Sequence, residues 1–314
     1  MRYKTLSKSD LKVSVIGLGT WVMGGENWGK ADDTKSIATI HKAIDSGINL
    51  IDTAPAYGNG HAEEIVGKAI RGKRSQLIIA TKCGIDRRSG FAFNLKPEFI
   101  RMEIENSLKR LNIDAIDLYQ CHWPDPSTPV EDSMNELLKM QSQGKIRYIG
   151  VSNFDVPLLE KAMETTPLVS VQPHYSLLER DIEKNLLPFC REKNIGVLTY
   201  GSIGGGILTG KYKKPQSFGG MDARNFFYAF FKEPYWSKTQ NLISEMKEIA
   251  EKHRKPLAHI AINWVTQQSG ITSALVGART PEQIEINAGA GEWELSQEEL
   301  QQIQDSHNRI FGIQ

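Results

Sequence analysis

The chain has 314 residues, of which 40% are hydrophobic and 24% charged, an ordinary composition for a globular protein that buries its own core. Its 38 basic and 37 acidic residues give a net charge of +1, so the sequence lacks the basic excess that is typical of nucleic-acid-binding proteins. No run approaches the roughly 18 apolar residues of a membrane helix, and the polar N-terminus does not resemble a signal peptide. These features predict a cytoplasmic protein without nucleic-acid or membrane partners, and they leave the oligomeric state open.

The three cysteines argue against both a disulfide framework and a zinc site. Cys83, Cys121 and Cys190 are an odd number, lie far apart and form no C-x-x-C pair. Two of them fall inside apolar runs, where cysteine is usually a small buried hydrophobe. No His, Asp or Glu cluster has the spacing of a metal site either. We therefore expect a reducing compartment and no metal.

Eight short apolar runs alternate with segments of helical spacing along the whole chain. The runs cover residues 13–20, 48–54, 76–82, 115–123, 145–153, 168–176, 195–202 and 273–278, and helices are expected over 32–47, 62–73, 96–112, 129–143, 155–166, 182–194 and 281–290. The runs are nearly continuous in aliphatic and β-branched residues, as in parallel strands that are covered on both faces. The pattern predicts one α/β domain over 1–314 with a closed (β/α)₈ barrel. A doubly wound open sheet stays as the alternative, because alternation does not reveal closure.

Three segments depart from the simple repeat. The first dozen residues, YKTL and LKV around a polar SKSD, predict a β-hairpin before the first barrel strand. The connection between the seventh and eighth strands, 203–272, is unusually long, with a Gly-rich and aromatic loop over 203–237 and helices over 239–254 and 257–268. A C-terminal helix over 296–310 begins at Ser296, and Glu299 three residues later completes a capping-box signature.

Polar residues at the carboxyl ends of the strands form a candidate acid–base site. Asp52 ends the second run and Tyr57 follows across the turn TAPAYG, while Lys82 ends the third run and His122 the fourth. Asp52 alone could cap a turn, and His122 alone could be a hydrogen-bonded core histidine. Lys82 is harder to explain structurally, because a buried lysine needs a charged partner, and Asp52 on the neighbouring strand is available. A lysine beside Tyr57 is expected to lower the pKa of the phenol from about 10, so that Tyr57 can protonate a carbonyl oxygen while His122 orients it.

Two glycine-rich segments resemble phosphate-binding loops without matching them. GLGTWVM at 17–23 has Val22 where the dinucleotide fingerprint needs its third glycine. GGILTGKY at 205–212 has Tyr212 where a P-loop needs the Ser or Thr that binds magnesium. A loop that approaches a pyrophosphate with backbone N–H groups, or a flexible lid, fits this second segment better than an NTPase site.

The motifs taken together resemble the aldo-keto reductase family. TAPAYG, AEEIVGKAI, IIATK, IDLYQCHWPD and KIRYIGVSNF occur in order, and the similarity extends from GLGTW to GARTPEQIEIN. The resemblance implies a (β/α)₈ barrel with an N-terminal hairpin, NADPH bound without a Rossmann fold, and reversible reduction of aldehydes or ketones to alcohols without metal. It is nearest to the bacterial branch with YGS…LTGK and GAR motifs.

The resemblance also implies roles for individual residues. Asp52, Tyr57, Lys82 and His122 correspond to the catalytic tetrad, with Tyr57 as the proton donor, and Trp21, Tyr57, His122 and Trp123 would form an aromatic substrate pocket for flat or apolar carbonyl compounds. The implied cofactor contacts are Thr20, Trp21, Asp52, Ser152, Asn153, Gln172, Tyr200, Gly201, Ser202, Ile203, Gly204, Gly206, Ile207, Lys211, Arg224, Gly277, Ala278, Arg279, Gln283 and Asn287. Within this set Ser152, Asn153 and Gln172 would hold the nicotinamide carboxamide and Tyr200 would stack on its ring. Residues 201–207 and Lys211 would face the pyrophosphate, with Arg224 in a flap over the cofactor, and residues 277–287 would bind the adenosine 2′-phosphate.

The 2′-phosphate segment departs from the commoner family pattern. Two basic positions are replaced, and Arg279 is the basic residue that remains in GARTPEQIEIN. We expect NADPH rather than NADH, with Arg279 as the residue behind that preference. Two other functions stay open at this point. One is a cofactor-sensing scaffold of the potassium-channel β-subunit type, which has the same fold, and the other is an isomerase on the same barrel that uses Lys82 or His122 without nicotinamide. The sequence does not indicate a particular substrate.

Overall fold

A closed barrel of eight parallel strands forms the centre of the computed structural model, which describes residues 1–26, 28–88 and 90–312. Around the barrel the strands follow the order β3 (Ile16–Gly19), β4 (Leu50–Asp52), β5 (Ile78–Cys83), β8 (Ile116–Cys121), β9 (Ile146–Ser152), β10 (Ser170–Gln172), β11 (Gly196–Thr199) and β12 (Ile271–Gly277). β12 pairs with β3, so the sheet has no free edge. The predicted closed barrel is confirmed, and the open-sheet alternative is wrong.

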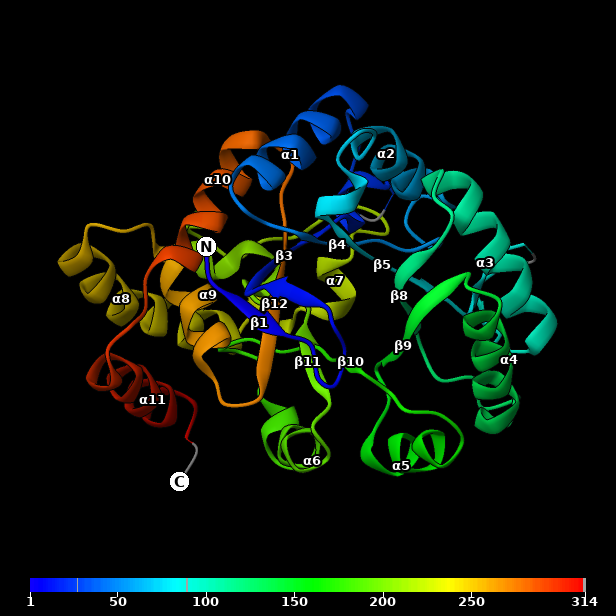
Figure 1. The fold of residues 1–314 in the computed structure, drawn as a ribbon. Helices are drawn as coiled ribbons and strands as arrows, with labels where there is room; N and C mark the ends of the chain where they lie inside the picture. Colours follow the sequence, from blue (N-terminus) through cyan, green and yellow to red (C-terminus); the bar gives the residue numbers. More distant parts are fainter. Residues whose placement is uncertain (27, 89, 313–314) are drawn as a thin grey trace.

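Helices surround the barrel on its outer face (Figure 1). The ring consists of α1 (Asp33–Asp45), α2 (His61–Ala69), α3 (Pro97–Leu111), α4 (Val130–Ser142), α5 (Val156–Thr165), α6 (Leu186–Lys193), α9 (Leu257–Gln267) and α10 (Pro281–Gly289). Asp32 caps the N-terminus of α1, because its side chain accepts a hydrogen bond from the Lys35 N–H. Helix α6 begins later than the sequence suggested, after a 3₁₀ turn over Asp181–Glu183.

The N-terminal hairpin closes the amino-terminal end of the barrel. β1 (Tyr3–Thr5) pairs with β2 (Lys12–Ser14), and Leu6, Leu11 and Val13 pack into an interior apolar cluster together with Leu50, Ile78, Ala80, Leu118, Val169, Leu198 and Leu275. We call this cluster the apolar plug. The run 13–20 is therefore two strands rather than one, because Val15 leaves the hairpin and Ile16 begins the barrel. With this end filled, the carboxyl ends of the strands are left for a binding site.

The long connection between β11 and β12 adds structure beyond the barrel. The expected loop over 203–237 contains short helical turns at Gly204–Thr209, Arg224–Phe227 (α7) and Ala229–Phe231, and α8 (Tyr235–His253) begins four residues before the predicted start. The C-terminal helix α11 (Gln297–Phe311) packs on α8, and its capping box between Ser296 and Glu299 is confirmed. A small sheet of β6 (Ile85–Asp86) and β7 (Ala92–Phe93) was not predicted. Among the described residues no helix is long and apolar enough to span a membrane.

A buried carboxyl group makes the stability of this fold depend on pH. Glu103 on α3 accepts a hydrogen bond from the Gly84 N–H at 2.7 Å, and burial raises its pKa to about 8. The folded state therefore binds more protons than the unfolded state between about pH 4.5 and 8, so this group makes unfolding easier as pH rises through that window.

We expect Glu103→Gln to flatten the pH dependence of stability. The amide still accepts the Gly84 hydrogen bond but does not ionise, so the variant should gain free energy of unfolding relative to the parent at pH 9 and differ little at pH 5. Thermal unfolding at both pH values measures this, with Glu105→Gln on the same helix as a control, since Glu105 pairs with Lys145 nearer the surface. An equal shift at both pH values would contradict the assignment to Glu103.

Candidate active site

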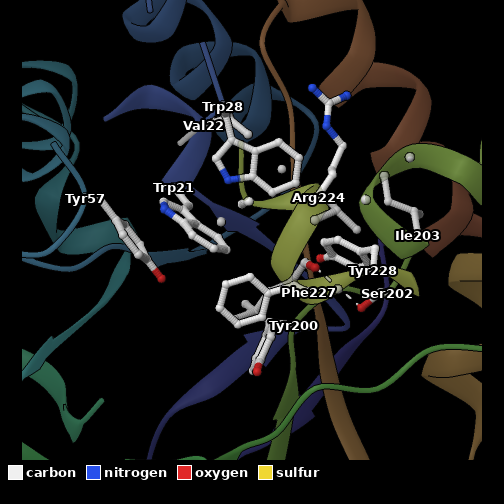
Figure 2. A pocket seen from close by; sticks show the side chains of 18 of the residues that line it. Trp21, Val22, Trp28, Tyr57, Tyr200, Ser202, Ile203, Arg224, Phe227 and Tyr228 are labelled. Atoms are coloured by element: carbon white, nitrogen blue, oxygen red, sulfur yellow. Dashed lines mark hydrogen bonds between the residues drawn. The ribbon is translucent and has the colours of Figure 1, made fainter. Parts of the chain in front are cut away.

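A cavity of about 1210 Å³ opens at the carboxyl ends of the barrel strands and extends beneath the β11–β12 connection. Figure 2 shows aromatic side chains on several sides of it. The residues from the predicted set that line it are Trp21, Asp52, Tyr57, His122, Trp123, Ser152, Asn153, Gln172, Tyr200, Gly201, Ser202, Ile203, Gly206, Lys211, Arg224, Gly277, Ala278, Arg279, Gln283 and Asn287. The structure thus brings together residues from all parts of the chain.

Lys82 holds the catalytic candidates together below the cavity. Its Nζ donates to Asp52 Oδ1 at 2.6 Å, to the Thr53 carbonyl at 3.1 Å and to the Tyr57 hydroxyl at 3.3 Å. The Lys82 side chain is 1% exposed and that of Asp52 3%, so the pair is shielded from solvent. His122 lies on the other side of Tyr57, with ring centroids 5.8 Å apart and the planes nearly perpendicular.

The turn that carries Tyr57 is fixed by a close backbone approach. Gly58 has φ +64°, and a Cβ there would lie 2.2 Å from the carbonyl oxygen of Gly24. Only glycine fits such a contact at a positive φ. The turn is thereby pressed against the segment after β3, and Trp21 from that segment stacks on Tyr57 with centroids 5.8 Å apart.

Burial decides the protonation state of the two candidate acid–base groups. Burial, together with the charge of Asp52, raises the pKa of Tyr57 well above 10. The expected lowering by Lys82 is therefore wrong for this structure, because Asp52 offsets the lysine charge and desolvation dominates. Burial and the charge of Lys82 lower the pKa of His122 well below 6.5. A neutral phenol and a neutral imidazole thus face the cavity, a suitable pair for donating and orienting a proton.

The pKa of Lys82 is subject to opposing effects. Burial lowers its pKa, whereas the charge of Asp52 and the hydrogen bond to it act in the opposite direction. Breaking the pair by removing either partner would leave an uncompensated charge in a dry interior.

A chain of hydrogen bonds orders the polar wall next to His122. Asn153, at φ +60°, donates through Nδ2 to the His122 carbonyl at 2.9 Å, and its Oδ1 accepts from the Tyr200 hydroxyl at 2.9 Å. Ser152 Oγ donates to the Gln172 carbonyl at 2.8 Å. The Tyr200 ring stacks on His174, which lies behind it, with centroids 4.9 Å apart. This wall presents amide groups and one aromatic ring.

Four residues of the predicted set do not line the cavity. Thr20 is buried and donates to the Asp52 carbonyl, and Lys82 lies behind Tyr57. Gly204 and Ile207 are buried, and the Ile207 side chain lies in the main core. The assignment of Thr20, Gly204 and Ile207 as cofactor contacts therefore finds no support in the cavity lining. Within the glycine turn over Gly204–Thr209, Gly205, Gly206 and Thr209 line the cavity, whereas Gly204, Ile207 and Leu208 do not.

Arg224 and aromatic residues cover the middle of the cavity. The Arg224 guanidinium pairs with Asp222 at 2.6 Å, donates to the Tyr212 hydroxyl at 2.8 Å and lies 3.7 Å from the Phe218 ring centroid. Trp28 and Phe227 both pack edge-on against Trp21. Sequence motifs did not indicate Trp28 or Phe227 individually; Trp28 lies in the segment after β3, and Phe227 ends α7 in the β11–β12 connection.

The far end of the cavity lies at the start of α10. The Thr280 side chain caps this helix, and Gln283 Oε1 accepts the backbone N–H of Arg279 at 2.9 Å. The Arg279 guanidinium makes no hydrogen bond or ion pair to any described residue, although its charge contributes to lowering the pKa of Asp222. A surface pair between Arg279 and Glu282, which would have made the arginine structural, is not formed within that part of the chain.

Comparisons with known proteins agree with this architecture. Residues 15–308 match the model of the aldo/keto reductase family. The chain is 42% identical to aldo-keto reductase YhdN of Bacillus subtilis over 307 residues, covering 96% of this chain and 92% of that protein. It is 36% identical to the NADH-specific methylglyoxal reductase of Escherichia coli, covering 92% and 93%.

Solved structures lead to the same family. The glycerol dehydrogenase AKR11B4 from Gluconobacter oxydans superposes with a TM-score of 0.90 at 40% identity, covering 98% of this chain and 95% of that chain. The aldo-keto reductase AKR11C1 from Bacillus halodurans superposes with a TM-score of 0.83 at 27% identity, covering 98% and 96%. The chain therefore belongs to the aldo/keto reductase family and is an oxidoreductase that reduces carbonyl groups.

Proposed function

We propose that this protein reduces small aldehydes or ketones with NADPH, and that Tyr57 supplies the proton. The observation that carries this proposal is the position of the Tyr57 hydroxyl, which lies at the cavity wall within 3.3 Å of the buried Lys82 ammonium. A potassium-channel-type scaffold is disfavoured, because the similar proteins named above are reductases and a dehydrogenase. An isomerase would not need the large second half of the cavity that leads to Arg279.

The cavity residues fit a nicotinamide dinucleotide. The amide-rich wall at Asn153 and Gln172 suits a carboxamide, and Lys211 beside the glycine turn suits a pyrophosphate. The guanidinium of Arg279, which has no hydrogen bond or ion pair to a described residue, lies beside the N-terminus of α10 and suits a phosphate, since such an end favours negative charge. When bound, the nicotinamide supplies a hydride to the carbonyl carbon.

The chain's own residues would perform the proton transfer and the orientation. The Tyr57 O–H donates to the carbonyl oxygen of the substrate, and Lys82 stabilises the phenolate that remains. Asp52 keeps Lys82 charged and in place. Neutral His122 directs the carbonyl oxygen towards Tyr57, while Trp21 and Trp123 exclude water and offer flat apolar faces to the substrate. The names of the similar proteins favour methylglyoxal, assayed for reduction, and glycerol, assayed for oxidation, as first substrates.

We also propose a reducing cytoplasmic setting. The three cysteines are free thiols and all are buried. Such thiols need no oxidising compartment.

Tyr57→Phe should lower kcat by about 10²- to 10⁴-fold, the usual contribution of a general acid. Removal of the hydroxyl deletes the proton donor and leaves the ring stacked on Trp21. Steady-state reduction of methylglyoxal measures the loss, and fluorescence titration should show NADPH affinity within about twofold of the parent. A folded variant with parental kcat would eliminate Tyr57 as the acid.

Lys82→Met should lower both activity and stability. The substitution leaves Asp52 as an unpaired buried carboxylate, which typically costs about 3–5 kcal/mol, and removes the cation that stabilises the phenolate. Asp52→Asn should cause a milder loss, since the lysine keeps an amide partner. The pH–rate profile and thermal unfolding test both effects, and an unchanged profile in Lys82→Met would refute the coupling to Tyr57.

Arg279→Ala should weaken NADPH binding about 10- to 100-fold and NADH binding little. Charge-assisted hydrogen bonds to a phosphate are worth about 1.5–3 kcal/mol, and only NADPH carries the 2′-phosphate. The difference should shrink as salt rises. Lys211→Met is the matched control, because a pyrophosphate contact should affect both cofactors equally. Equal losses for the two cofactors in Arg279→Ala would leave the NADPH preference without a residue to explain it, as would no loss.

A further inference from the structure

A layer of amide side chains lies inside the barrel between the apolar plug and the catalytic residues. On β8 the side chains of Leu118 and Gln120 point inward, with Leu118 in the plug and Gln120 one step closer to the cavity. Gln120 is fully buried and is the register partner of Lys82 on β5. Gln120 stands two residues before His122 and therefore on the same face of the strand, although no sequence motif marks it.

Gln120 and Gln172 both donate to the oxygen of Asp52 that Lys82 does not use. Gln172 Nε2 donates to Asp52 Oδ2 at 2.8 Å, and Gln120 Nε2 reaches the same oxygen at 3.4 Å. The two amides are also joined, since Gln172 Nε2 donates to Gln120 Oε1 at 3.3 Å. One carboxylate is thus held from both sides, by an ammonium at Oδ1 and by two amides at Oδ2.

The network allows one orientation of each amide. A flipped Gln120 would turn its oxygen towards the Asp52 carboxylate and its NH₂ towards the NH₂ of Gln172, and both contacts would be repulsive. With both of its N–H groups used, Gln172 keeps Oε1, which accepts no hydrogen bond from a described residue, as the acceptor available to a ligand in the cavity. The orientation of the Gln172 amide therefore depends on its contacts with Asp52 and Gln120.

The barrel leaves room for this connection at one point. Gln120 and Gln172 lie on β8 and β10, and the strand between them carries Gly150 at the level of Gln120. A Cβ at Gly150 would lie 3.3 Å from Gln120 Cγ and 2.2 Å from Ser170 Oγ. Because Gly150 has no side chain, the amides of Gln120 and Gln172 can meet across β9.

We propose that Gln120 is a positioning residue for the reaction. It fixes the Asp52 carboxylate so that Oδ1 faces Lys82, and it orients the Gln172 amide towards the cavity. This proposal rests on the proposed function for its catalytic consequence. Gln120 touches no substrate and acts through Asp52. A polar side chain with no such role would be out of place next to the apolar plug, where an unpaired amide is costly.

Two substitutions at this position separate positioning from packing. Gln120→Leu has a similar volume and removes both hydrogen bonds. Gln120→Glu, when protonated, donates to Asp52 and accepts from Gln172 as the amide does, but it loses the donor on ionisation. The charged groups that face the position are Asp52 on β4 and Lys82 on β5, while β9 and β10 offer Gly150 and the uncharged Ser170 and Gln172.

In activity assays with NADPH and methylglyoxal, Gln120→Leu should lose about 10-fold or more in kcat at every pH. Gln120→Glu should retain activity near the parent at pH 6 and approach the Leu variant by pH 9, because the ionised carboxylate repels Asp52. Tyr119→Phe is the control, since the neighbouring side chain points into the outer core. Parental kcat in Gln120→Leu, the absence of recovery in Gln120→Glu, or an equal loss in Tyr119→Phe would each overturn the proposal.

Thermal unfolding of the cofactor-free protein tests the same contact without activity. Gln120→Leu should lower the free energy of unfolding more in the parent than in the Asp52→Asn variant, because that variant has no charged carboxylate for Gln120 to contact. At pH 6 the Gln120→Glu variant should have a higher free energy of unfolding than the Gln120→Leu variant. This difference should become smaller as pH rises, since a buried carboxyl group favours its neutral form in the folded state. Additive effects of the two substitutions would overturn the proposed link to Asp52. If the parent has no reductase activity but still shows this coupling, the proposed function is wrong, whereas the contact between Gln120 and Asp52 is supported.

Discussion

The ion pair between Lys82 and Asp52 is the constraint on which the rest of the site depends. Two opposite charges lie 2.6 Å apart in the interior of a closed barrel, nearly without access to solvent. Desolvation of such a pair can cost as much as its attraction returns, so the pair is poorly suited as a device for stability alone. It is placed where Nζ also reaches the Tyr57 hydroxyl, and in the proposed reaction this contact lets the lysine charge stabilise the phenolate.

The surrounding layers keep this pair dry and fixed. Below it the hairpin and the barrel interior supply the apolar plug, and beside it Gln120 and Gln172 satisfy the second carboxylate oxygen. Above it Trp21 covers Tyr57, and Phe227 and Trp28 cover Trp21. In the proposed reaction, low polarity on most sides would strengthen each interaction with the developing oxyanion. It also keeps Tyr57 and His122 neutral, so that the lysine is the cationic member of the group.

The cavity has a chemical end, where the catalytic candidates lie, and an opposite, anchoring end, which in the proposed function holds the cofactor. The chemical end is built from strand termini, which are held by barrel hydrogen bonds and by the contact between Gly58 and Gly24. The anchoring end is formed by the glycine turn after β11 and by the capped start of α10. Arg224 and its partners Asp222, Tyr212 and Phe218 lie between the two ends. Rigid strands suit groups that must align to within a fraction of an ångström, whereas loops suit a ligand that has to enter and leave.

The sequence by itself determined the elements and the identity of the chemical groups. Eight apolar runs, the Ser296 capping box and the strand-end positions of Asp52, Lys82 and His122 all follow from local pattern, because hydrophobic periodicity and cap residues act over a few residues. Only the tertiary structure decided that the sheet closes, that Val15 separates the hairpin from the barrel, and that Ile207 turns into the core. It also decided the sign of the pKa shift at Tyr57, since desolvation depends on everything packed around a group. The contacts behind the proposed role of Gln120 also depend on the tertiary structure, because its partners, Asp52 and Gln172, stand 68 and 52 residues away in the chain and meet only when the barrel closes.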